Sequence, residues 1–181
     1  MVRLNIKKLS LQPLSIYSSK DGITREGRCT MRLREREITD QTAIEAIIRS
    51  SLVCRLGLSD ENRPYIVPLC FGYQGRALYF HGAREGKKID MIRKNPYVCF
   101  EFDLNSGVEE AEEACKWGMS YQSVIGSGQA TLVDHPEEKK EALKIIMGQY
   151  SDREFSFPDH FIEKTGIIKV NIEEMTGKES G

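Results

Sequence analysis

Hydrophobic residues recur at helical spacing in a first segment that begins after residue 38. Thr39 or Asp40 can cap a helix here, because a side-chain oxygen at this position accepts from the free backbone N–H groups of the first turn. The apolar face of the segment is formed by Ala43, Ile44, Ile47 and Ile48. This spacing predicts an amphipathic helix that ends near Ser50.

Two later segments have the same helical character. Residues 86–94 carry isoleucines on one side and stop before Asn95-Pro96, since a proline disfavours helical backbone in the residue before it. The other segment starts at His135-Pro136 and reads "PEEKKEALKIIMGQY", with proline in the first turn and glutamates that complement the helix dipole. Both segments are predicted to be helices.

Shorter apolar or alternating runs predict six strands separated by turn residues. They cover residues 52–58, 65–73, 76–82, 97–103, 120–134 and 166–175. Gln74-Gly75 predicts a hairpin between the second and third strands, and Gly126 and Gly128 mark a bend or bulge in the fifth. The strands follow one another with short turns, which favours a barrel over a doubly wound sheet. We therefore expect a mainly β fold with flanking helices.

Two stretches do not fit regular strands. Pro68 lies in the middle of the second predicted strand, and proline cannot donate a hydrogen bond to a neighbouring strand. This strand is expected either to be irregular at Pro68 or to face something other than a partner strand there, such as a ligand. Residues 104–118 are acidic and rich in small residues, which predicts a loop or a short irregular insertion.

Length and charge limit the class of protein. The 181 residues predict one domain over residues 31–181, preceded by a weakly patterned N-terminal extension over residues 1–30. The chain has 26 Lys and Arg residues and 27 Asp and Glu residues, a net charge of -1, so no overall field attracts it to nucleic acid. The sequence lacks the long apolar stretch that would predict a signal peptide or a membrane span.

The chain has an odd set of five cysteines without a C-x-x-C pair. They are Cys29, Cys54, Cys70, Cys99 and Cys115. Several lie in apolar, strand-like runs, where a free cysteine is typically a small buried hydrophobe. Their spacing does not match a structural zinc site, and no metal site is predicted. A reduced, cytoplasmic protein is the simplest interpretation.

The turn before the second predicted helix combines small residues with basic ones, within the stretch "YFHGAREGKKIDMIRKNP". The small residues are Gly82, Ala83 and Gly86, and the basic residues are Arg84, Lys87 and Lys88. A helix N-terminus supplies free N–H groups and a partial positive charge, so cations there are unfavourable unless an anion is bound. The pattern is typical of a phosphate site, and a solvated helix end is the alternative interpretation.

Four segments of the chain occur in an order that is found in a known protein family. They read "PYIVPLCFGY", "LYFHGAREGKKIDMIRKNPYVCFE", "YQSVIGSGQATLVDHPEEKKEALKIIM" and "IEEMTGKES". From Met31 to about Ser180 the chain resembles the flavin-nucleotide-binding relatives of pyridoxamine 5′-phosphate oxidase, nearest the nitroimidazole-resistance (Nim-type) proteins. The resemblance implies a split β-barrel that forms a homodimer. It also implies FMN, with FAD as the alternative, held at or near the subunit interface.

The resemblance further implies which residues bind the flavin. The residues matched to the strand along the flavin ring are Ile66, Val67, Pro68 and Leu69. Those matched to the segment beside the ring and the ribityl chain are Phe80, His81, Gly82 and Ala83. The basic residues matched to the phosphate are Arg84, Lys87 and Lys88. A later strand that contacts the cofactor, from the same or the other subunit, is matched by Ser123 and Val124.

His81 is the candidate catalytic residue. In the Nim-like branch a histidine matching this position is the usual active-site candidate, because an imidazole beside a flavin can polarise a substrate or donate a proton. A strand-end histidine bonded to backbone is the alternative. His135 precedes a helix proline and is interpreted as a cap or surface residue, and His160, in a polar and aromatic loop, is assigned no role.

Trp117 and Tyr121 flank the acidic insertion. An aromatic side chain in this place either covers a face of a flavin or packs at the mouth of the barrel. Packing is the preferred interpretation.

The sequence differs from true pyridoxamine 5′-phosphate oxidases, and these differences limit the reactions that are expected. The arginine and tyrosine motifs that grip a substrate phosphate in those enzymes are not found, so vitamin B6 oxidation is only a minor alternative. The sequence has no G-x-G-x-x-G segment after a strand, so a Rossmann site is not expected. The leading hypothesis is an FMN-dependent oxidoreductase that reduces small compounds such as nitroimidazoles. The alternatives are a non-catalytic flavin-binding protein for storage, transport or redox sensing, and a haem-binding protein.

Overall fold

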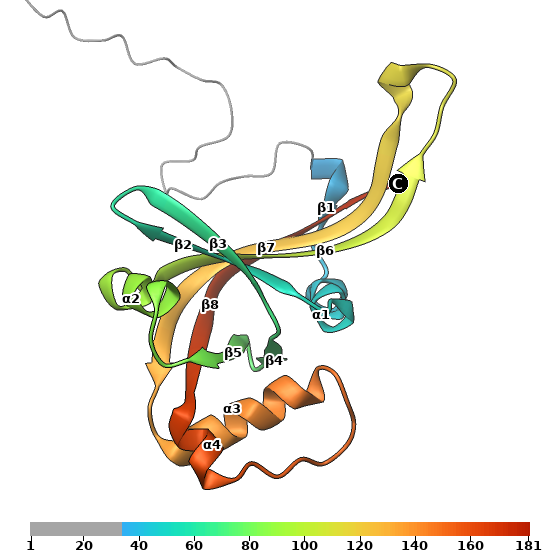
Figure 1. Cartoon of the computed structure of the whole chain (residues 1–181). Coiled ribbons are helices and arrows are strands. Elements are labelled where there is room, and N and C mark those ends of the chain that lie inside the picture. Colours follow the sequence, from blue (N-terminus) through green and yellow to red (C-terminus); the bar gives the residue numbers. More distant parts are fainter. Residues whose placement is uncertain (1–33) are drawn as a thin grey trace, which may run out of the picture. The chain divides into compact units, whose positions relative to one another are not determined.

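The computed structural model describes residues 34–181 of the chain (Figure 1). The predicted extension over residues 1–30 lies outside these residues, as does Cys29. Residues 35–181 form one compact unit. Within this described unit, no helix has both the length and the apolar character needed to cross a membrane.

A sheet of eight strands forms the body of this unit, and every neighbouring pair of strands runs antiparallel. The strands are β1 (Glu37–Ile38), β2 (Cys54–Asp60), β3 (Arg63–Leu69), β4 (Gly72–Gln74), β5 (Ala77–Ala83), β6 (Tyr97–Glu109), β7 (Gly118–Val133) and β8 (Thr165–Ser180). Their spatial order is β3-β2-β6-β7-β8-β5-β4, with β1 paired to β8. The long strands β6, β7 and β8 curve strongly, so that β2 and β5 lie on either side of a common core (Figure 1).

Helices flank the sheet as the sequence predicted. They are α1 (Gln41–Ser50), α2 (Lys87–Lys94), α3 (Pro136–Gly148) and α4 (Asp159–Lys164), with short 3-10 turns at Arg34–Arg36 and Ala114–Lys116. The cap of α1 is Asp40, whose carboxylate accepts from the N–H of Thr42 at 3.1 Å. The three predicted helices are confirmed, and His135 occupies the N-cap position of α3 as an exposed residue without a side-chain capping bond. The fourth helix was not predicted, because one six-residue segment is too short to show a helical period.

Two glycine-containing irregularities lie close to where the sequence placed them. The hairpin between β4 and β5 turns at Gly75-Arg76, where both residues have φ of 59°, one position later than predicted. The register between β7 and β8 shifts between Ser127 and Gly128, which confirms the predicted bulge. A Cβ at Gly128 would collide with the backbone of Asn171, so this close approach requires glycine.

The second predicted strand is divided into two, and the break is not at Pro68. β3 pairs with β2 without interruption from Arg63 to Leu69, including the pair Pro68↔Arg55. Of the two alternatives expected for Pro68, the irregular strand is therefore wrong, and the strand edge without a partner strand is what the described sheet has. β3 is instead an edge strand of the described sheet, which is where proline is tolerated, because the edge away from β2 has no partner strand.

Residues 104–118 are a loop only in part: strand structure takes in residues 104–109 and Gly118, and the predicted loop is confined to residues 110–117. β6 continues to Glu109 and pairs with β7 through Glu109↔Gly118, past a bulge between Asn105 and Gly107. The far ends of β6 and β7 therefore form a two-stranded arm that projects beyond the rest of the sheet, with a 3-10 turn at its tip (Figure 1). We call residues 105–121 the arm.

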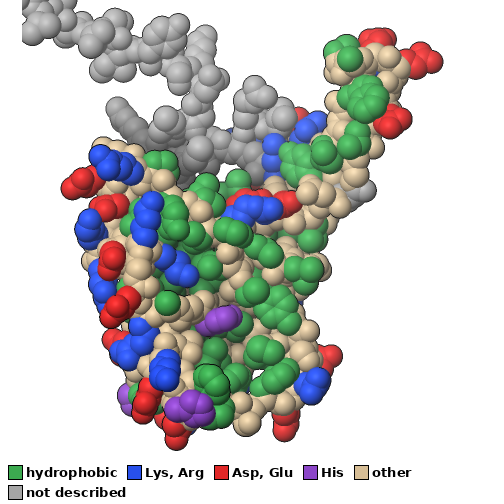
Figure 2. Space-filling model, in the orientation of Figure 1, with side chains coloured by type: hydrophobic (Ala, Val, Ile, Leu, Met, Phe, Trp, Pro, Cys, Tyr) green, Lys and Arg blue, Asp and Glu red, His purple; other side chains and the backbone are tan. Residues whose placement is uncertain are grey.

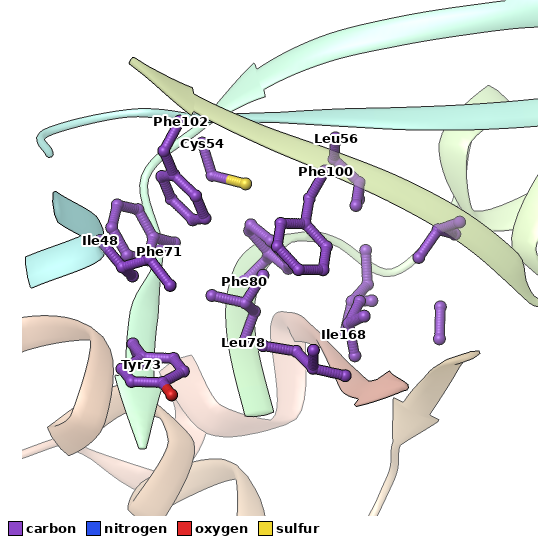
Figure 3. Packing of buried hydrophobic residues seen from close by; sticks show 14 of the residues in the cluster. Ile48, Cys54, Leu56, Phe71, Tyr73, Leu78, Phe80, Phe100, Phe102 and Ile168 are labelled. Carbon is purple, nitrogen blue, oxygen red and sulfur yellow. The ribbon is translucent and has the colours of Figure 1, made fainter. Parts of the chain in front are cut away.

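The core lies between the concave side of the sheet and helices α1 and α2. Phe71, Phe80 and Phe100 converge in the space between β5 and β6 (Figure 3), and each is at most 1% exposed. The rings of Phe71 and Phe102 lie 4.8 Å apart. Of the four described cysteines only Cys54 is buried in this core, whereas Cys70, Cys99 and Cys115 are exposed free thiols. The expectation that several cysteines pack in the core holds for Cys54 alone.

One tyrosine ties the segment after α3 to the break between β3 and β4. The Tyr150 hydroxyl accepts from the N–H of Phe71 at 2.9 Å and donates to the carbonyl of Leu52 at 2.9 Å. Desolvation raises the pKa of this hydroxyl to about 12, so it remains a donor at neutral pH. The adjacent Gln149 side chain donates to the carbonyls of Arg49 and Ser51 at 2.8 and 3.0 Å. These four bonds fix the chain before β2 and after β3, on both sides of the hairpin that the two strands form.

Replacing Tyr150 by phenylalanine is expected to lower the free energy of unfolding by about 1–3 kcal/mol, because the N–H of buried Phe71 loses its acceptor. Urea denaturation at pH 7 measures this change. Tyr97→Phe is the matched control, since Tyr97 is 59% exposed and its hydroxyl has only a 3.4 Å contact with Gln129. Equal midpoints for the two variants would contradict the role of Tyr150.

Candidate functional site

The turn between β5 and α2 leaves the N-terminus of α2 without a side-chain cap. Gly86 occupies the N-cap position with φ of 113°, a conformation that side chains rarely permit, and makes no side-chain capping bond. The first N–H groups of α2 have no partner within the helix. Together with the helix dipole, they make this turn a place where an anion is stabilised.

Lys88 is the basic residue that the fold places most specifically. Its side chain lies over β5, since a Cβ added at Gly82 would be 3.3 Å from the Lys88 Nζ. Desolvation by burial lowers the pKa of Lys88 from its ordinary value of 10.5. Among residues 34–181 the ammonium group has no hydrogen-bond acceptor and no ion-pair partner. A half-buried cation in this state is stabilised by any anion that reaches it.

Lys87 connects the same turn to the edge strand β3. Its Nζ lies 4.0 Å from the centre of the Tyr65 ring, a cation–π contact. The turn therefore touches β5 through Lys88 and β3 through Lys87. These are the two strands that the sequence analysis matched to the flavin ring, and the structure brings them together with the basic residues.

Arg84 makes a contact that the sequence analysis did not predict. Its Nη1 donates to the carbonyl of Glu163 at 2.9 Å, in α4. This bond fixes the end of β5 to the helix that precedes β8, next to the pair Ala83↔Thr165. Arg84 thus has a structural contact in addition to its predicted role near the phosphate.

The four residues matched on β3 do not share one face. Ile66 and Pro68 are exposed, and Ile66 is 65% exposed, whereas Val67 and Leu69 are partly buried and pack against the core. The side chains alternate because β3 is a regular strand. A ligand along the free edge of β3 would meet the backbone of all four residues, but the side chains of only two on either face.

On β5, His81 is exposed and the neighbouring Phe80 is fully buried. The Phe80 side chain belongs to the core, so only its backbone can contact a ligand. The His81 ring makes no hydrogen bond within residues 34–181, and the alternative of a strand-end histidine bonded to backbone finds no support there. Gly82 and Ala83 follow and lead directly into the basic turn.

Ser123 and Val124 lie apart from this cluster within one chain. Val124 is completely buried, and Ser123 is opposite Asp103 of β6. The first residue of β6, Tyr97, follows α2 directly and lies six positions away along that strand, or about 20 Å. The Val124 side chain belongs to the core, and a contact of Ser123 with a cofactor of the other subunit stays a prediction.

Trp117 was expected to pack at the mouth of the barrel, and this is wrong. It is 51% exposed on the arm, and its indole Nε1 donates to the carbonyl of Ala111 at 2.7 Å. Tyr121 is partly buried, with Lys178 Nζ 5.8 Å from its ring centre. The sequence analysis missed the exposed position of Trp117, because it interpreted the segment beside Trp117 as an irregular insertion and not as the end of two paired strands.

The donor set fits a phosphate group. It combines an uncapped helix N-terminus, a half-buried lysine and a glycine that leaves room for the lysine side chain. By contrast, residues 34–181 contain no group of three or more His, Cys, Asp or Glu side chains placed to hold a metal ion.

Comparison with known proteins agrees with this geometry. The family model described as pyridoxamine 5′-phosphate oxidase matches residues 40–179. The chain belongs to this family. The match contains β2 to β7, all four helices and nearly all of β8, and the fold is the split β-barrel of the family. A search of curated proteins found no match.

Solved structures extend the comparison. A protein from Bacteroides thetaiotaomicron, whose name proposes a role in 5-nitroimidazole antibiotic resistance, is 37% identical, with a TM-score of 0.72 over 79% of this chain and 86% of that one. The flavocytochrome Anf3 from Azotobacter vinelandii is 21% identical, with a TM-score of 0.75 over 89% and 76%. The FAD and heme binding protein from Mycobacterium smegmatis is 15% identical, with a TM-score of 0.72 over 80% and 73%. At 21% and 15% identity, the last two similarities show a shared fold and nothing further.

Replacing Lys88 by methionine is expected to raise the stability of the ligand-free protein at pH 7, because the variant no longer buries a charge. The sign follows from the lowered pKa: the unfolded chain binds more protons, so wild-type stability rises with pH as Lys88 loses its proton. The advantage of the variant should therefore shrink as the pH approaches 10.5, the ordinary pKa of lysine. Urea denaturation of the variant and the wild type at pH 7 and pH 10 measures this difference in the free energy of unfolding.

Lys144→Met provides the control, since Lys144 is exposed on α3. If Lys88→Met is the less stable protein at pH 7, or if its advantage does not depend on pH, the half-buried cation is not a source of instability.

Proposed function

We propose that the chain binds a flavin nucleotide, FMN in the first instance, with the phosphate at the N-terminus of α2. The observation that carries the proposal is the Lys88 ammonium, which is half-buried over Gly82 beside uncapped N–H groups. Membership of the pyridoxamine 5′-phosphate oxidase family supports it. FAD is the alternative flavin, because its pyrophosphate offers the same chemistry to this turn.

In this proposal each part of the site has a separate task. Lys88 and the N–H groups of α2 hold the phosphate, and Lys87 adds charge while it stays over Tyr65. The backbone of β3 from Ile66 to Leu69 flanks the ring. The backbone of β5 passes on the other side, where Gly82 has no side chain that would displace Lys88.

We further propose an oxidoreductase that reduces small compounds, nitroaromatic compounds such as nitroimidazoles among them. The 37% identity to the protein named for 5-nitroimidazole resistance supports this class of substrate. A bound flavin supplies the transfer of electrons. In this proposal the imidazole of His81, which is exposed one residue before Gly82, polarises a substrate or donates a proton.

The alternative is a flavin-binding protein without its own catalytic cycle, which stores or carries flavin or senses redox state. Flavin that stays oxidised with NAD(P)H and does not pass electrons to nitro compounds would favour this alternative. A Soret band without flavin absorption would instead indicate haem. We also propose a homodimer in a reducing, cytoplasmic setting, which the free thiols of the four described cysteines support.

Purified protein is expected to be yellow and to release FMN, or else FAD, identified by mass. The double variant Lys87→Gln/Lys88→Gln should weaken flavin binding by on the order of a hundredfold or more, because two charges at the phosphate are lost. Titration of the flavin-free protein, followed by flavin fluorescence, measures the affinity. Lys140→Gln/Lys144→Gln on α3 is the control. Unchanged affinity in the first variant would place the phosphate elsewhere.

Replacing His81 by alanine is expected to leave flavin bound and to lower the turnover of nitro compounds by about 100-fold or more, as for the loss of a general acid. Stopped-flow absorbance should then separate reduction of the flavin from its reoxidation by substrate. His135→Ala serves as the control, since His135 is exposed at the start of α3. Full turnover by His81→Ala would remove His81 from the reaction.

A further inference from the structure

A small cavity lies between α2, the start of α3 and the neighbouring ends of β5, β7 and β8. Its volume is about 40 Å³, enough for one water molecule or one small ion. The charged side chains that line it are Arg84, Arg93, Asp134 and Lys139. Three positive charges and one negative charge leave a surplus of two positive charges around this space.

Lys139 brings a buried charge to the cavity. It is 4% exposed, and no other charged residue in the described part of the chain is classed as buried. Its Nζ donates to the carbonyl of Thr165 at 2.9 Å and to that of Ile162 at 3.5 Å. An ammonium group has three N–H donors, so one remains for a group in the cavity. Because no carboxylate among residues 34–181 forms an ion pair with it, this buried charge is only partly compensated.

The two arginines form the exposed side of the cavity. Nη1 of Arg84 donates to the carbonyl of Glu163 at 2.9 Å, and the other N–H groups of this guanidinium have no acceptor within the described residues. Nη1 of Arg93 lies 3.6 Å from Oδ1 of Asp90, a pair between exposed side chains of one helix. Such a surface pair is weak, so both arginines retain the capacity to bind an anion.

Asp134 is the carboxylate at the cavity, and it does not neutralise the cluster. It follows β7 as an exposed residue and forms no ion pair with any lysine or arginine that the structure describes. Figure 2 shows Lys and Arg side chains that alternate with Asp and Glu along the side of the molecule that carries α2. Lys94 and Asp60, 2.8 Å apart, are such a pair. The cavity differs from this surface because its cations outnumber its carboxylates and one of the cations is buried.

We infer that this cavity binds a single small inorganic anion of the size of chloride. The anion accepts from the remaining N–H of Lys139 and from the guanidinium groups of Arg84 and Arg93, and hydrogen bonds of this kind between charged groups are strong. It also supplies the opposite charge that a buried cation requires. The volume is close to that of one water molecule, so the cavity has no room for a nucleotide.

The anion site is separate from the proposed phosphate site. Lys88 lies over Gly82 at the N-terminus of α2. Arg93 lies near the other end of this helix, seven residues beyond the N-cap Gly86, or about 10 Å along the axis. The inference therefore does not depend on the proposed function. An anion in the cavity would link α2, α3 and the end of β5, because these three elements supply its cations.

Chloride is expected to stabilise flavin-free, full-length protein more than an anion that is too large for the cavity. Urea denaturation in potassium chloride and in potassium gluconate, at equal ionic strength, measures the difference. This difference should grow with chloride concentration, since an ion that binds only the folded state stabilises it by mass action. Equal midpoints in the two salts at every concentration would overturn the inference.

Arg93→Gln should weaken chloride binding by on the order of tenfold, because one charge at the anion is lost. This variant is preferred to a change at Lys139, which also holds the end of α4. Arg153→Gln is the matched control, since Arg153 is exposed in the segment after α3 and forms no ion pair with a described residue. A chloride effect that is the same in both variants would contradict the site.

Lys88→Gln separates the anion site from the phosphate site. It should weaken flavin binding and leave the stabilisation by chloride unchanged. A chloride effect that is lost in Lys88→Gln and kept in Arg93→Gln would place the anion at the N-terminus of α2 and overturn the inference. Flavin binding without any chloride effect would leave only the proposed function standing, and the reverse result would leave only the anion site.

Crystals grown in bromide give the direct test, because bromide replaces chloride and scatters anomalously. An anomalous peak is expected in the cavity, in contact with Nζ of Lys139 and with at least one of the two arginines. Anomalous peaks elsewhere on the molecule, with none in the cavity, would overturn the inference.

Discussion

The pairing of β7 with β6 on one side and β8 on the other is the constraint on which the rest of the structure depends. The ladder with β6 runs from Gly118 to Gln129 of β7, and the ladder with β8 runs from Tyr121 to Val133. A shift of one residue in either ladder would move Val124 and its neighbours from the core to the convex side. The pairing also separates the arm from α2, and it carries β8 to β5, where His81 and Gly82 lie.

The candidate site is built around a local conflict that the fold maintains. Lys88 lies at the uncapped end of a helix and loses water to burial, and both effects disfavour its charge. The core tolerates this because Ile89, Met91 and Ile92 hold α2 in place. A bound phosphate would satisfy the lysine and the free N–H groups together, so the ligand and the fold would stabilise each other.

Much of the fold could be predicted from the sequence, because its signals are local. Helix caps, the Pro136 start of α3, the bulge at Gly128 and the alternating strands each depend on neighbouring residues. The arm was missed, since "NSGVEEAEEACKWG" has little strand propensity, and its two ends, up to Glu109 and from Gly118, are held extended by pairing between β6 and β7. In the candidate site, the basic cluster could be predicted from the sequence, because its residues are neighbours in the chain. The contact of Lys87 with Tyr65 and that of Arg84 with α4 could not, because they join residues far apart in the chain.

By itself, the sequence determined the kinds of element, the family resemblance and the small and basic residues of the turn at 82–88. The tertiary structure decided which of these residues face each other. It left Lys88 half-buried, assigned Phe80 and Val124 to the core, and exposed Trp117 on the arm. The physical reason is that burial and register are properties of paired strands, and a single segment does not contain its partner.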